Sequence, residues 1–319
     1  MKQTVSVSLV CTVRDEADNI AVLLDSMLQQ TRPPDEIVVN DCLSRDATPQ
    51  IVGSYIARGH PIRLVRGGYN IPSGRNNAIR HAQGSIVACT DAGLTLDTHW
   101  LEHIIAPLER DQADIVGGFF RPMPQSLFEL VLGATNYREA AEINPETFLP
   151  FGKSVAFYKR AWEHVDGYPE WVDHCEDVLF DLALKRAGYR FAFAPDALVL
   201  FRPRSSFAAF AKQYFLYARG DGMAHLWSTR HLMRYTVYTV GTGLLVLAWR
   251  HPWVLGLFGL GLFVYTRTPL RRLCLRGDGL TKREAIYTAS LIPLIRIVGD
   301  VSKMLGYPVG LFRRFQKHL

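Results

Sequence analysis

Three aspartates in the first hundred residues each follow a short apolar run. Asp15, Asp41 and Asp91 lie within two residues of the ends of runs rich in valine, isoleucine and cysteine. A carboxylate at a strand end can accept hydrogen bonds from a nucleobase or a ribose, and it can hold a divalent cation through oxygen. One such aspartate is commonly a turn or cap residue. Three at successive strand ends of one sheet would share an edge, so we expect a ligand site there.

A further acidic pair, Glu176-Asp177, begins a segment whose apolar residues have helical spacing. Acidic residues in the first turn of a helix are also favoured by the helix dipole, so their position alone does not define a site. A carboxylate that faced the three aspartates would be suited to draw the proton from a hydroxyl nucleophile. We therefore treat this pair as the candidate catalytic group.

The elements that must position these residues alternate between strand-like and helix-like patterns. The expected strands are 5–13, 37–39, 62–65, 86–90, 115–116, 155–158 and 191–194. Helices with one apolar face lie between the first four of them, and we expect Asp18, Thr48 and Ser73 to cap these helices. This alternation predicts an α/β fold with a mostly parallel, mixed, Rossmann-like sheet and flanking helices. Ligands of such sheets bind beyond the carboxyl ends of the strands, where the three aspartates fall.

The composition becomes markedly apolar in the last third of the chain. The runs 235–249 and 253–266 would each be about 22 Å long as a helix, shorter than the roughly 30 Å hydrocarbon core of a bilayer. Flanking arginines and terminal aromatic residues favour a short membrane hairpin with both ends cytosolic. A buried helical hairpin in a soluble domain is the alternative. The segment 285–312, interrupted by Pro293 and Pro308, is expected to be an amphipathic stretch at the membrane interface.

Charge and cysteine content narrow the partners and the compartment. The 319 residues carry a net charge of +6, and the basic residues concentrate around the apolar runs after Arg202. This pattern favours an anionic membrane surface over nucleic acid, which would need a basic groove with interleaved aromatic residues. The five cysteines are scattered without a CxxC pair, so we expect neither a disulfide framework nor a zinc site, and a reducing compartment. The chain begins directly with a strand pattern, so we expect no signal peptide.

Four blocks with a recognisable order occur along the chain. They are the opening strand with Val13-Arg-Asp-Glu16, the segment Asp41-Cys-Leu-Ser-Arg-Asp-Ala-Thr48, the segment Ser73-Gly-Arg-Asn-Asn-Ala78 with Ala82-Gln-Gly84, and Glu176-Asp177. In these blocks and their order the sequence resembles the family 2 glycosyltransferases, which have the nucleotide-binding fold called GT-A. The resemblance covers about residues 5–222.

This resemblance implies roles for the residues of the blocks. Asp15, Glu16 and Asp41 would contact the nucleobase and ribose of a nucleotide diphosphate sugar, and Arg75 would lie near this donor. Asp91 would begin the metal-associated Asp-x-Asp motif, which reads Asp91-Ala-Gly here and lacks the second carboxylate. A divalent cation, Mg²⁺ or Mn²⁺, can still be held by Asp91 with help from donor phosphates and water. Transfer without a metal is the alternative.

Processive members of the family carry Gln-x-x-Arg-Trp, whereas this chain has Gln213-Tyr-Phe-Leu216. We therefore expect one sugar to be added per encounter. Arg219, close by in sequence, is expected to approach the donor diphosphate, and a solvated arginine at a helix end is the alternative. In the expected reaction Asp177 is the general base, Glu176 orients a substrate, and Arg219 or Lys153 helps to neutralise the leaving diphosphate. A single displacement implies inversion at the anomeric carbon.

Together these patterns predict an inverting, non-processive glycosyltransferase at the cell membrane. Residues 1–222 would form the cytosolic transferase domain and residues 223–319 the membrane-associated helices, with a lipid or lipid-linked acceptor. A nucleotidyltransferase is disfavoured because Arg14-Asp-Glu-Ala-Asp18, not a glycine-rich phosphate loop, follows the first strand. A non-catalytic membrane scaffold that binds a sugar nucleotide is the alternative from another class.

Overall fold

The computed structural model describes residues 5–277 and 279–317, which form two compact units. The first unit comprises the chain up to Arg121 together with Ala140–Phe201, and the second comprises Pro122–Glu139 together with the chain from Arg202 onward. The sequence predicted a transferase domain that ends at residue 222 and a membrane-associated region after it. That functional boundary stays a prediction. The compact units divide the chain at other positions.

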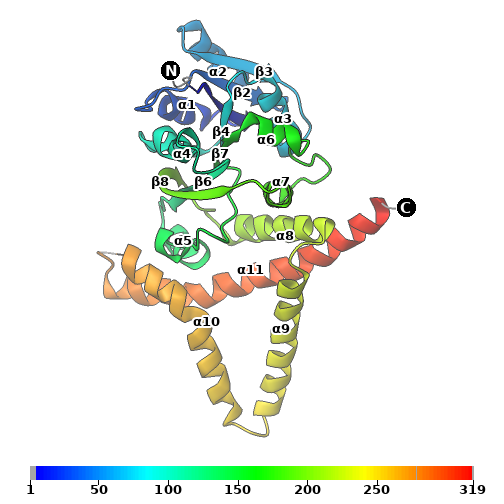
Figure 1. Ribbon diagram of the computed structural model, residues 1–319. Helices are drawn as coiled ribbons and strands as arrows, with labels where there is room; N and C mark the ends of the chain where they lie inside the picture. Colours follow the sequence, from blue (N-terminus) through cyan, green and yellow to red (C-terminus); the bar gives the residue numbers. More distant parts are fainter. Residues whose placement is uncertain (1–4, 278, 318–319) are drawn as a thin grey trace. The chain divides into compact units, whose positions relative to one another are not determined.

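The first unit is built on one mixed sheet whose described strands lie in the order β3-β2-β1-β4-β7-β6-β8-β5 (Figure 1). The strands are β1 (Val7–Val13), β2 (Glu36–Asp41), β3 (Ile62–Arg66), β4 (Ile86–Asp91), β5 (Leu94–Leu96), β6 (Ile115–Pro122), β7 (Ser154–Tyr158) and β8 (Phe191–Phe201). Strands β1 to β4 pair in parallel, whereas β7 is antiparallel to both β4 and β6, and β5 is antiparallel to β8. The predicted mixed α/β sheet is confirmed. The short strand β5 was not predicted.

Helices cover this sheet, and the apolar faces of the first three have the spacing that the sequence predicts. The helices of the first unit are α1 (Ile20–Leu28), α2 (Thr48–Ala57), α3 (Ile71–His81), α4 (Trp100–Glu109), the 3-10 turn η1 (Ala140–Glu142), α6 (Lys159–His164) and α7 (Glu176–Arg186). In α1 the buried apolar side chains are Ile20, Leu23, Leu24 and Met27, which recur every three or four residues. These faces and the strand residues such as Val10 and Val87 exclude water from the interior.

The predicted helix caps were wrong in each case. Helix α1 begins after Asn19 without a side-chain cap, and Thr48 is the first residue of α2. The Thr48 hydroxyl accepts from the backbone N–H of Glu16, so it joins two loops instead of capping a helix. At α3 the cap is Asn70, whose side chain accepts from the backbone N–H of Ser73, and the Ser73 hydroxyl accepts in return from the backbone N–H of Asn70. Ser73 is thus the second member of a capping box.

Strand register brings the three aspartates to one edge of the sheet. Val13 lies opposite Asp41 in the β1–β2 pair, and Thr12 lies opposite Asp91 in the β1–β4 pair. Because all three strands run in the same direction, the segments that follow them leave the sheet at the same edge. Asp15 lies in the segment that follows β1 there. The predicted convergence of Asp15, Asp41 and Asp91 at the carboxyl edge is confirmed.

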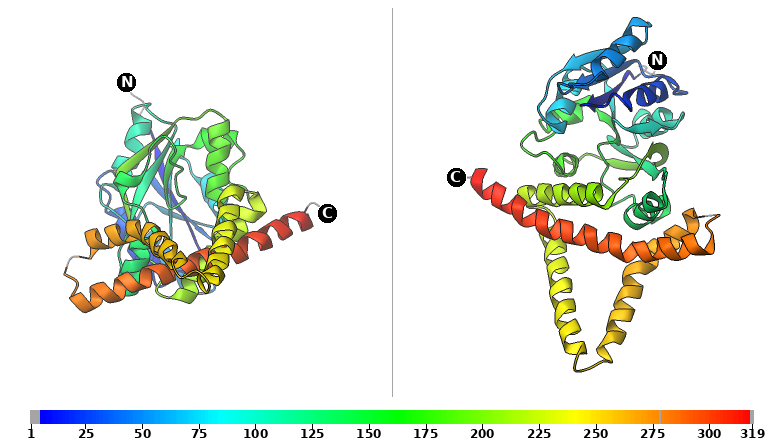
Figure 2. Two further views of the ribbon diagram at one scale, coloured as in Figure 1. Left: turned by 90° about the horizontal axis from the view of Figure 1, so that it is seen from below. Right: turned by 180° about the vertical axis from the view of Figure 1, so that it is seen from behind.

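The second unit is helical. It contains α5 (Leu127–Asn136), α8 (Phe207–Ala224), α9 (Ser228–Ala248), α10 (Val254–Arg276) and α11 (Lys282–Lys317). Helix α8 lies along α11 in both views of Figure 2. Their interior includes Val131 and Leu132 of α5, Phe210 of α8, and Ile292 and Ile295 of α11. Helices α9 and α10 form the hairpin that the two apolar runs predict.

Helix α11 is continuous through both of its prolines, so the predicted interruption of this segment was wrong. A proline inside a helix removes the N–H that would bond to the carbonyl four residues earlier. For Pro308 that carbonyl belongs to Met304, and the Tyr235 hydroxyl of α9 donates to it at 2.5 Å. A side chain from a neighbouring helix therefore supplies the missing donor. The periodicity of α11 alone gave no sign of that donor.

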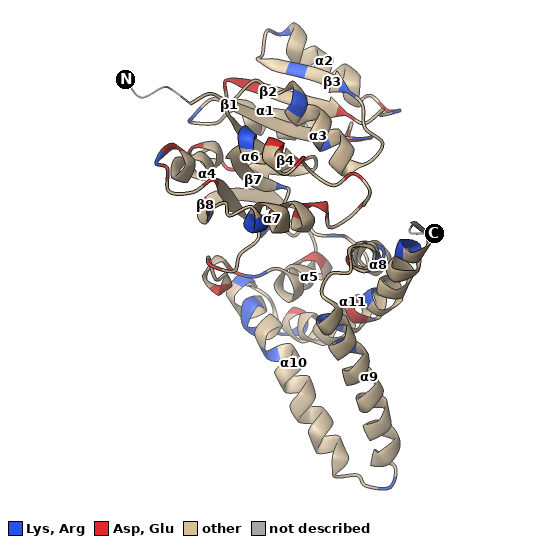
Figure 3. Ribbon diagram, turned by 45° about the vertical axis from the view of Figure 1, so that its right-hand side comes forward, with Lys and Arg blue, Asp and Glu red and all other residues tan. Residues whose placement is uncertain are grey.

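Apolar side chains are exposed along α9 and α10, in contrast to the alternative of a buried hairpin. Most of the length of both helices carries no charge in Figure 3. Exposed apolar side chains include Leu232, Val237 and Val246 on α9, Leu260, Phe263 and Leu275 on α10, and Trp249 and Trp253 in the turn between the two helices. Among the described helices only α11, over Lys282–Gln316, is both long and apolar enough to cross a membrane. Exposed apolar surface of this extent commonly marks a membrane or protein contact.

Candidate active site

The loops after β1 and β2 are held together by hydrogen bonds that involve Asp15. Its Oδ1 accepts from the backbone N–H of Arg45 at 2.8 Å, and its own backbone N–H donates to the Ser44 hydroxyl at 2.9 Å. Asp15 has a left-handed backbone with φ of 53°, a conformation that aspartate tolerates better than most residues. The next residue, Glu16, donates its N–H to the Thr48 hydroxyl at 2.8 Å. Asp15 and Glu16 therefore lie on a fixed two-loop rim.

Asp41 is enclosed by this rim. Its carboxylate has no solvent exposure, accepts from the Ser44 backbone N–H at 2.9 Å and pairs with the Arg66 guanidinium at 3.0 Å. These bonds fix the loop that leads from β2 to α2. A contact between Asp41 and a ligand stays a prediction, because its partners in the structure are protein groups.

Arg75 links the end of β4 to the start of α7. Its side chain is 3% exposed, and its guanidinium contacts Asp91 Oδ1 at 2.8 Å and Glu176 Oε1 at 3.2 Å. Burial opposes the charged form, but Asp91 is the main group that raises the pKa of Arg75 well above its ordinary value. The guanidinium carbon also lies 4.9 Å from the centre of the Tyr168 ring. Asp91 and Glu176 are 85 residues apart in the sequence and belong to two predicted parts of the site. Both contact the same buried cation, Arg75.

Gly152 belongs to the same cluster and was missed by the sequence analysis. A Cβ atom at this position would lie 2.7 Å from Arg75 Nη1, so only glycine lets the backbone approach the guanidinium this closely. The Gly152 N–H donates to Asp177 Oδ2 at 3.4 Å. The glycine precedes the buried strand β7, and that position was the only available signal in the sequence. The ring of Tyr168, which is itself buried, covers the Arg75 guanidinium in this cluster.

The pair Glu176-Asp177 opens α7, as predicted, and its two carboxylates have different surroundings. Glu176 is buried, and this burial together with neighbouring Asp177 raises the pKa of Glu176 to about 7, although Arg75 opposes the shift. Asp177 is half-buried. Its Oδ1 accepts from the backbone N–H of Val178 at 2.8 Å. The pair therefore offers an inner carboxyl group bound to Arg75 and an outer carboxylate.

Lys153 lies against aromatic rings, and its contact with a diphosphate stays a prediction. Its ammonium group lies 3.8 Å from the centre of the Phe120 ring and 4.5 Å from that of Phe201. Contacts of this kind hold a cation against aromatic faces. Arg219, the other predicted partner of the diphosphate, lies on α8 in the second unit, so its place near a donor stays a prediction.

The metal prediction rests on Asp91 alone. Within the described residues no three His, Cys, Asp or Glu side chains are grouped to hold a metal ion. The Asp91 side chain is nevertheless 40% exposed, and one of its oxygens is the Oδ1 that faces Arg75. One exposed carboxylate fits a cation such as Mg²⁺, which commonly takes few protein ligands and fills its shell with phosphate oxygens and water. It does not form a complete metal site by itself.

The parallel half-sheet, the carboxyl-edge aspartates and the acidic pair on α7 define a nucleotide-binding transferase fold of the GT-A type. Residues 8–163 match the model of the family described as glycosyl transferase family 2. The chain is therefore a glycosyltransferase that carries a family 2 domain. The resemblance found in its sequence blocks is confirmed.

Similar curated proteins support this assignment. Glycosyltransferase AglE of Haloferax volcanii is 25% identical over 252 residues, which are 75% of this chain and 80% of that protein. Succinoglycan biosynthesis protein ExoA of Rhizobium meliloti is 23% identical over 223 residues, which are 65% of this chain and 66% of that protein. Both alignments extend beyond the family domain.

Solved structures with the same fold include proteins bound to a nucleotide or a nucleotide sugar. Mannosyltransferase PcManGT of Pyrobaculum calidifontis, in complex with GDP-Man and Mn²⁺, has a TM-score of 0.59 and 20% identity, over 99% of this chain and 89% of that one. GalNAc-T7, with UDP, GalNAc and Mn²⁺, has a TM-score of 0.52 and 13% identity, over 63% of this chain and 43% of that one. At these identities the likeness establishes the fold.

Proposed function

We propose that this chain transfers a sugar from a nucleoside diphosphate donor to an acceptor hydroxyl, with inversion at the anomeric carbon. The observation that carries the proposal is the buried Arg75, which contacts Asp91 of the nucleotide edge and Glu176 of the acidic pair. The structural neighbours PcManGT and GalNAc-T7 were solved with a nucleotide or nucleotide sugar and Mn²⁺, which supports this donor class.

In the proposed reaction Asp15 and Glu16 of the two-loop rim, with Asp41 enclosed behind them, bind the nucleoside, and Arg75 lies near the donor. The acceptor oxygen attacks the anomeric carbon, and its proton passes to Asp177. The bond from that carbon to the diphosphate oxygen breaks, and the nucleoside diphosphate leaves with the electron pair. A hydroxyl is a poor nucleophile until a carboxylate draws off its proton, a contribution of about 10² to 10⁴ in rate.

Glu176 is assigned a positioning role. Its carboxyl group is tied to Arg75 and adjoins Asp177 in sequence, so it fixes the start of α7 relative to the end of β4. When bound at Asp91, a divalent cation would supply positive charge to the departing diphosphate. The residues of the chain itself bind and orient the donor and remove the proton.

We assign the acceptor to the lipid or lipid-linked class and the chain to the cell membrane, with the catalytic domain in the cytosol. Exposed apolar side chains on α9 and α10 and the long apolar helix α11 support a membrane location. On the full chain, an acceptor with its lipid tail should be used with a much lower KM than the same head group without a tail. Equal KM values for the two acceptors would contradict this assignment.

Replacement of the proposed base tests the catalytic assignment directly. Asp177→Asn should lower kcat by about 100-fold or more, because the amide cannot accept the proton. Donor binding should be kept, measured as the rise in melting temperature with each nucleoside diphosphate, with and without Mg²⁺ or Mn²⁺. Asp196→Asn, the same change at an exposed site on β8, is the control. Wild-type kcat in Asp177→Asn would place the base elsewhere.

A further inference from the structure

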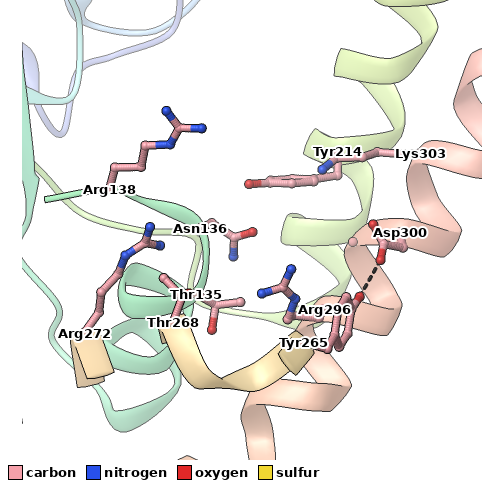
Figure 4. A pocket seen from close by; sticks show the side chains of 11 residues that line it. Thr135, Asn136, Arg138, Tyr214, Tyr265, Thr268, Arg272, Arg296, Asp300 and Lys303 are labelled. Atoms are coloured by element: carbon pink, nitrogen blue, oxygen red, sulfur yellow. Dashed lines mark hydrogen bonds between the residues drawn. The ribbon is translucent and has the colours of Figure 1, made fainter. Parts of the chain in front are cut away.

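The second unit contains a polar cavity that the transfer reaction does not use. It has a volume of about 450 Å³, within the range of roughly 300–1,000 Å³ that is usual for small-molecule sites. Side chains from α8, α10 and α11, from the C-terminal end of α5 and from the segment that follows α5 line it (Figure 4). All of its lining residues belong to the second unit.

Cations predominate on the walls of this cavity. Arg138, Arg272, Arg296 and Lys303 line it together with a single carboxylate, that of Asp300. That carboxylate already has partners: Arg234, which does not line the cavity, contacts its Oδ1 at 2.8 Å, and the hydroxyls of Tyr238 and Tyr265 donate to its Oδ2. The charge of Arg234 therefore compensates the negative charge of Asp300 from outside the cavity.

Two of the cations are held by aromatic rings and not by acids. The Arg296 guanidinium lies 3.9 Å from the centre of the Tyr265 ring, and the Lys303 ammonium lies 4.5 Å from that of Tyr214. Such contacts orient a cation but leave its charge in place. In the part of the chain that the structure describes, neither Arg296 nor Lys303 forms an ion pair with a carboxylate. Positive charges gathered in a partly buried cavity are unfavourable without an anion.

A hydroxyl in the wall gives an independent indication of a ligand. Thr135 is 8% exposed, and its buried Oγ1 has no hydrogen-bond partner among the described residues. Buried hydroxyls nearly always have a hydrogen-bond partner. A hydroxyl without one in the wall of a cavity therefore indicates that a ligand supplies the partner. In Figure 4 Thr135 lies between Arg272 and Arg296. An oxyanion at this place would accept from the hydroxyl and from the neighbouring guanidinium groups.

We propose that this cavity binds a phosphate group. Arginine forks, an ammonium group and a hydroxyl donor together match the oxygens of a phosphate. The one acidic side chain among the described lining residues, Asp300, is paired with Arg234. The phosphate is either the head group of an anionic lipid or a small soluble phosphate. The lipid is favoured, because α10 bears Arg272 of the cavity and also the exposed Leu260 and Phe263.

Binding to the full chain is measured without any sugar donor, so the result does not depend on the proposed transfer reaction. The probes are inorganic pyrophosphate and vesicles of phosphatidylcholine with or without phosphatidic acid. The double variant Arg296→Gln with Lys303→Gln should weaken binding by at least about tenfold, since a hydrogen bond to a charged group contributes about 1.5–3 kcal/mol. Arg267→Gln with Lys282→Gln removes the same charge from exposed positions on α10 and α11, outside the cavity.

Two further measurements keep the proposal testable if a variant folds poorly. Thr135→Val keeps the shape of the side chain and should weaken phosphate binding several-fold without lowering stability, because no protein hydrogen bond is lost. The cavity double variant should also melt at a higher temperature than the wild type without ligand, because cation repulsion is relieved. Loss of vesicle binding alone identifies a lipid, and loss of pyrophosphate binding identifies a soluble phosphate. Equal binding by the cavity and control pairs would overturn the proposal.

Discussion

Arg75 connects two carboxylates that come from distant parts of the first unit. Asp91 ends β4 and Glu176 begins α7, and the guanidinium between them is almost fully buried. Loss of the cation would leave Glu176 buried beside Asp177 without a compensating charge. The wall of the site therefore depends on this one side chain for its stability as well as for its chemistry.

Arg75→Met should lower the free energy of unfolding by about 3–5 kcal/mol, the usual result when one partner of a buried ion pair is removed. Chemical denaturation of both proteins measures the difference. Arg80→Met is a matched control, because Arg80 lies on the same helix and pairs with Glu170 at 3.2 Å, but its side chain is 56% exposed. An exposed pair contributes about 1 kcal/mol or less. Similar losses in both variants would contradict the role given to Arg75.

Glu176 should make the stability of the chain depend on pH. Its pKa is raised to about 7, so the folded chain holds this proton more tightly than the unfolded chain does. The stabilisation is fully present below the ordinary pKa of 4.5 and is lost as the pH rises through about 7. At 1.36 kcal/mol per pKa unit the change amounts to roughly 3 kcal/mol.

The variant Glu176→Gln isolates this effect. Between pH 5 and pH 8 the free energy of unfolding of the wild type should fall relative to that of the variant, since glutamine does not titrate. Denaturation at several pH values in that range measures the difference. A constant difference between the two proteins across the range would show that Glu176 does not titrate there.

At this scale the sequence predicts the carboxylates of the site better than their partners. Asp15, Asp41, Asp91 and the acidic pair follow from strand ends and ordered motifs, which are local features. Gly152 lies beside Arg75 only because two segments distant in sequence come together in the fold, and no local sequence pattern predicts that contact. The contacts of Lys153 with aromatic rings also follow from no local pattern in the sequence.

Helices α8 and α11 pack closely because glycines line their contact. A Cβ atom at Gly306 would lie 2.2 Å from the Phe215 carbonyl oxygen, and one at Gly310 would lie 2.1 Å from that of Arg219. No side chain fits in these gaps, so the backbones touch directly. Glycine is usually unfavourable inside a helix, by about 1 kcal/mol relative to alanine. Here that disadvantage is offset by the closeness of the packing.

Gly310→Ala should therefore destabilise the chain by about 1–3 kcal/mol or more, as overpacking usually does. Gly241→Ala is the control, because nothing lies within 4 Å of a Cβ atom at that position of α9. The control should be neutral or stabilising by up to about 1 kcal/mol. Melting temperatures in detergent compare the two variants, and a loss of stability in Gly241→Ala alone would refute this account of the packing.

The Tyr235 hydroxyl supplies the donor that Pro308 removes from α11. Tyr235→Phe should lower stability by about 1 kcal/mol, because the Met304 carbonyl then loses its donor. In the background Pro308→Ala the same substitution should have a smaller effect, since alanine restores the backbone N–H. Equal effects of Tyr235→Phe in both backgrounds would disprove the coupling. The sequence predicted a break at this proline because the rescuing group comes from another helix.

At the scale of the whole molecule, the exposed apolar hairpin of α9 and α10 is the feature from which we predict membrane attachment. The side chains of Val246 and Leu262 are 71% and 52% exposed. Val246→Arg with Leu262→Arg should lower the fraction of the protein recovered with membranes, because charged residues are costly in hydrocarbon. Val22→Arg, at a 54% exposed site on α1, should leave that fraction unchanged. Equal membrane fractions for all three proteins would exclude the hairpin as the anchor.

The sequence predicted the mixed sheet and the hairpin well, because both follow from hydrophobic periodicity. It did not predict the division into two units, because α5 belongs to the helical unit although strands of the first unit precede and follow it in the chain. Helix α5 has an ordinary apolar face. Nothing in its periodicity tells which partners will cover that face.

This interleaving has a consequence for the order of synthesis. The ribosome releases Leu127–Asn136 well before the segments that cover Val131 and Leu132, which begin with α8 and end with α11. A nascent chain must therefore carry an uncovered apolar helix until its last residues emerge, a state prone to aggregation. Shortened forms that stop before α11 would permanently lack the part of the cover that Ile292 and Ile295 supply, so production of the chain as a soluble fragment should fail even where the first unit is complete.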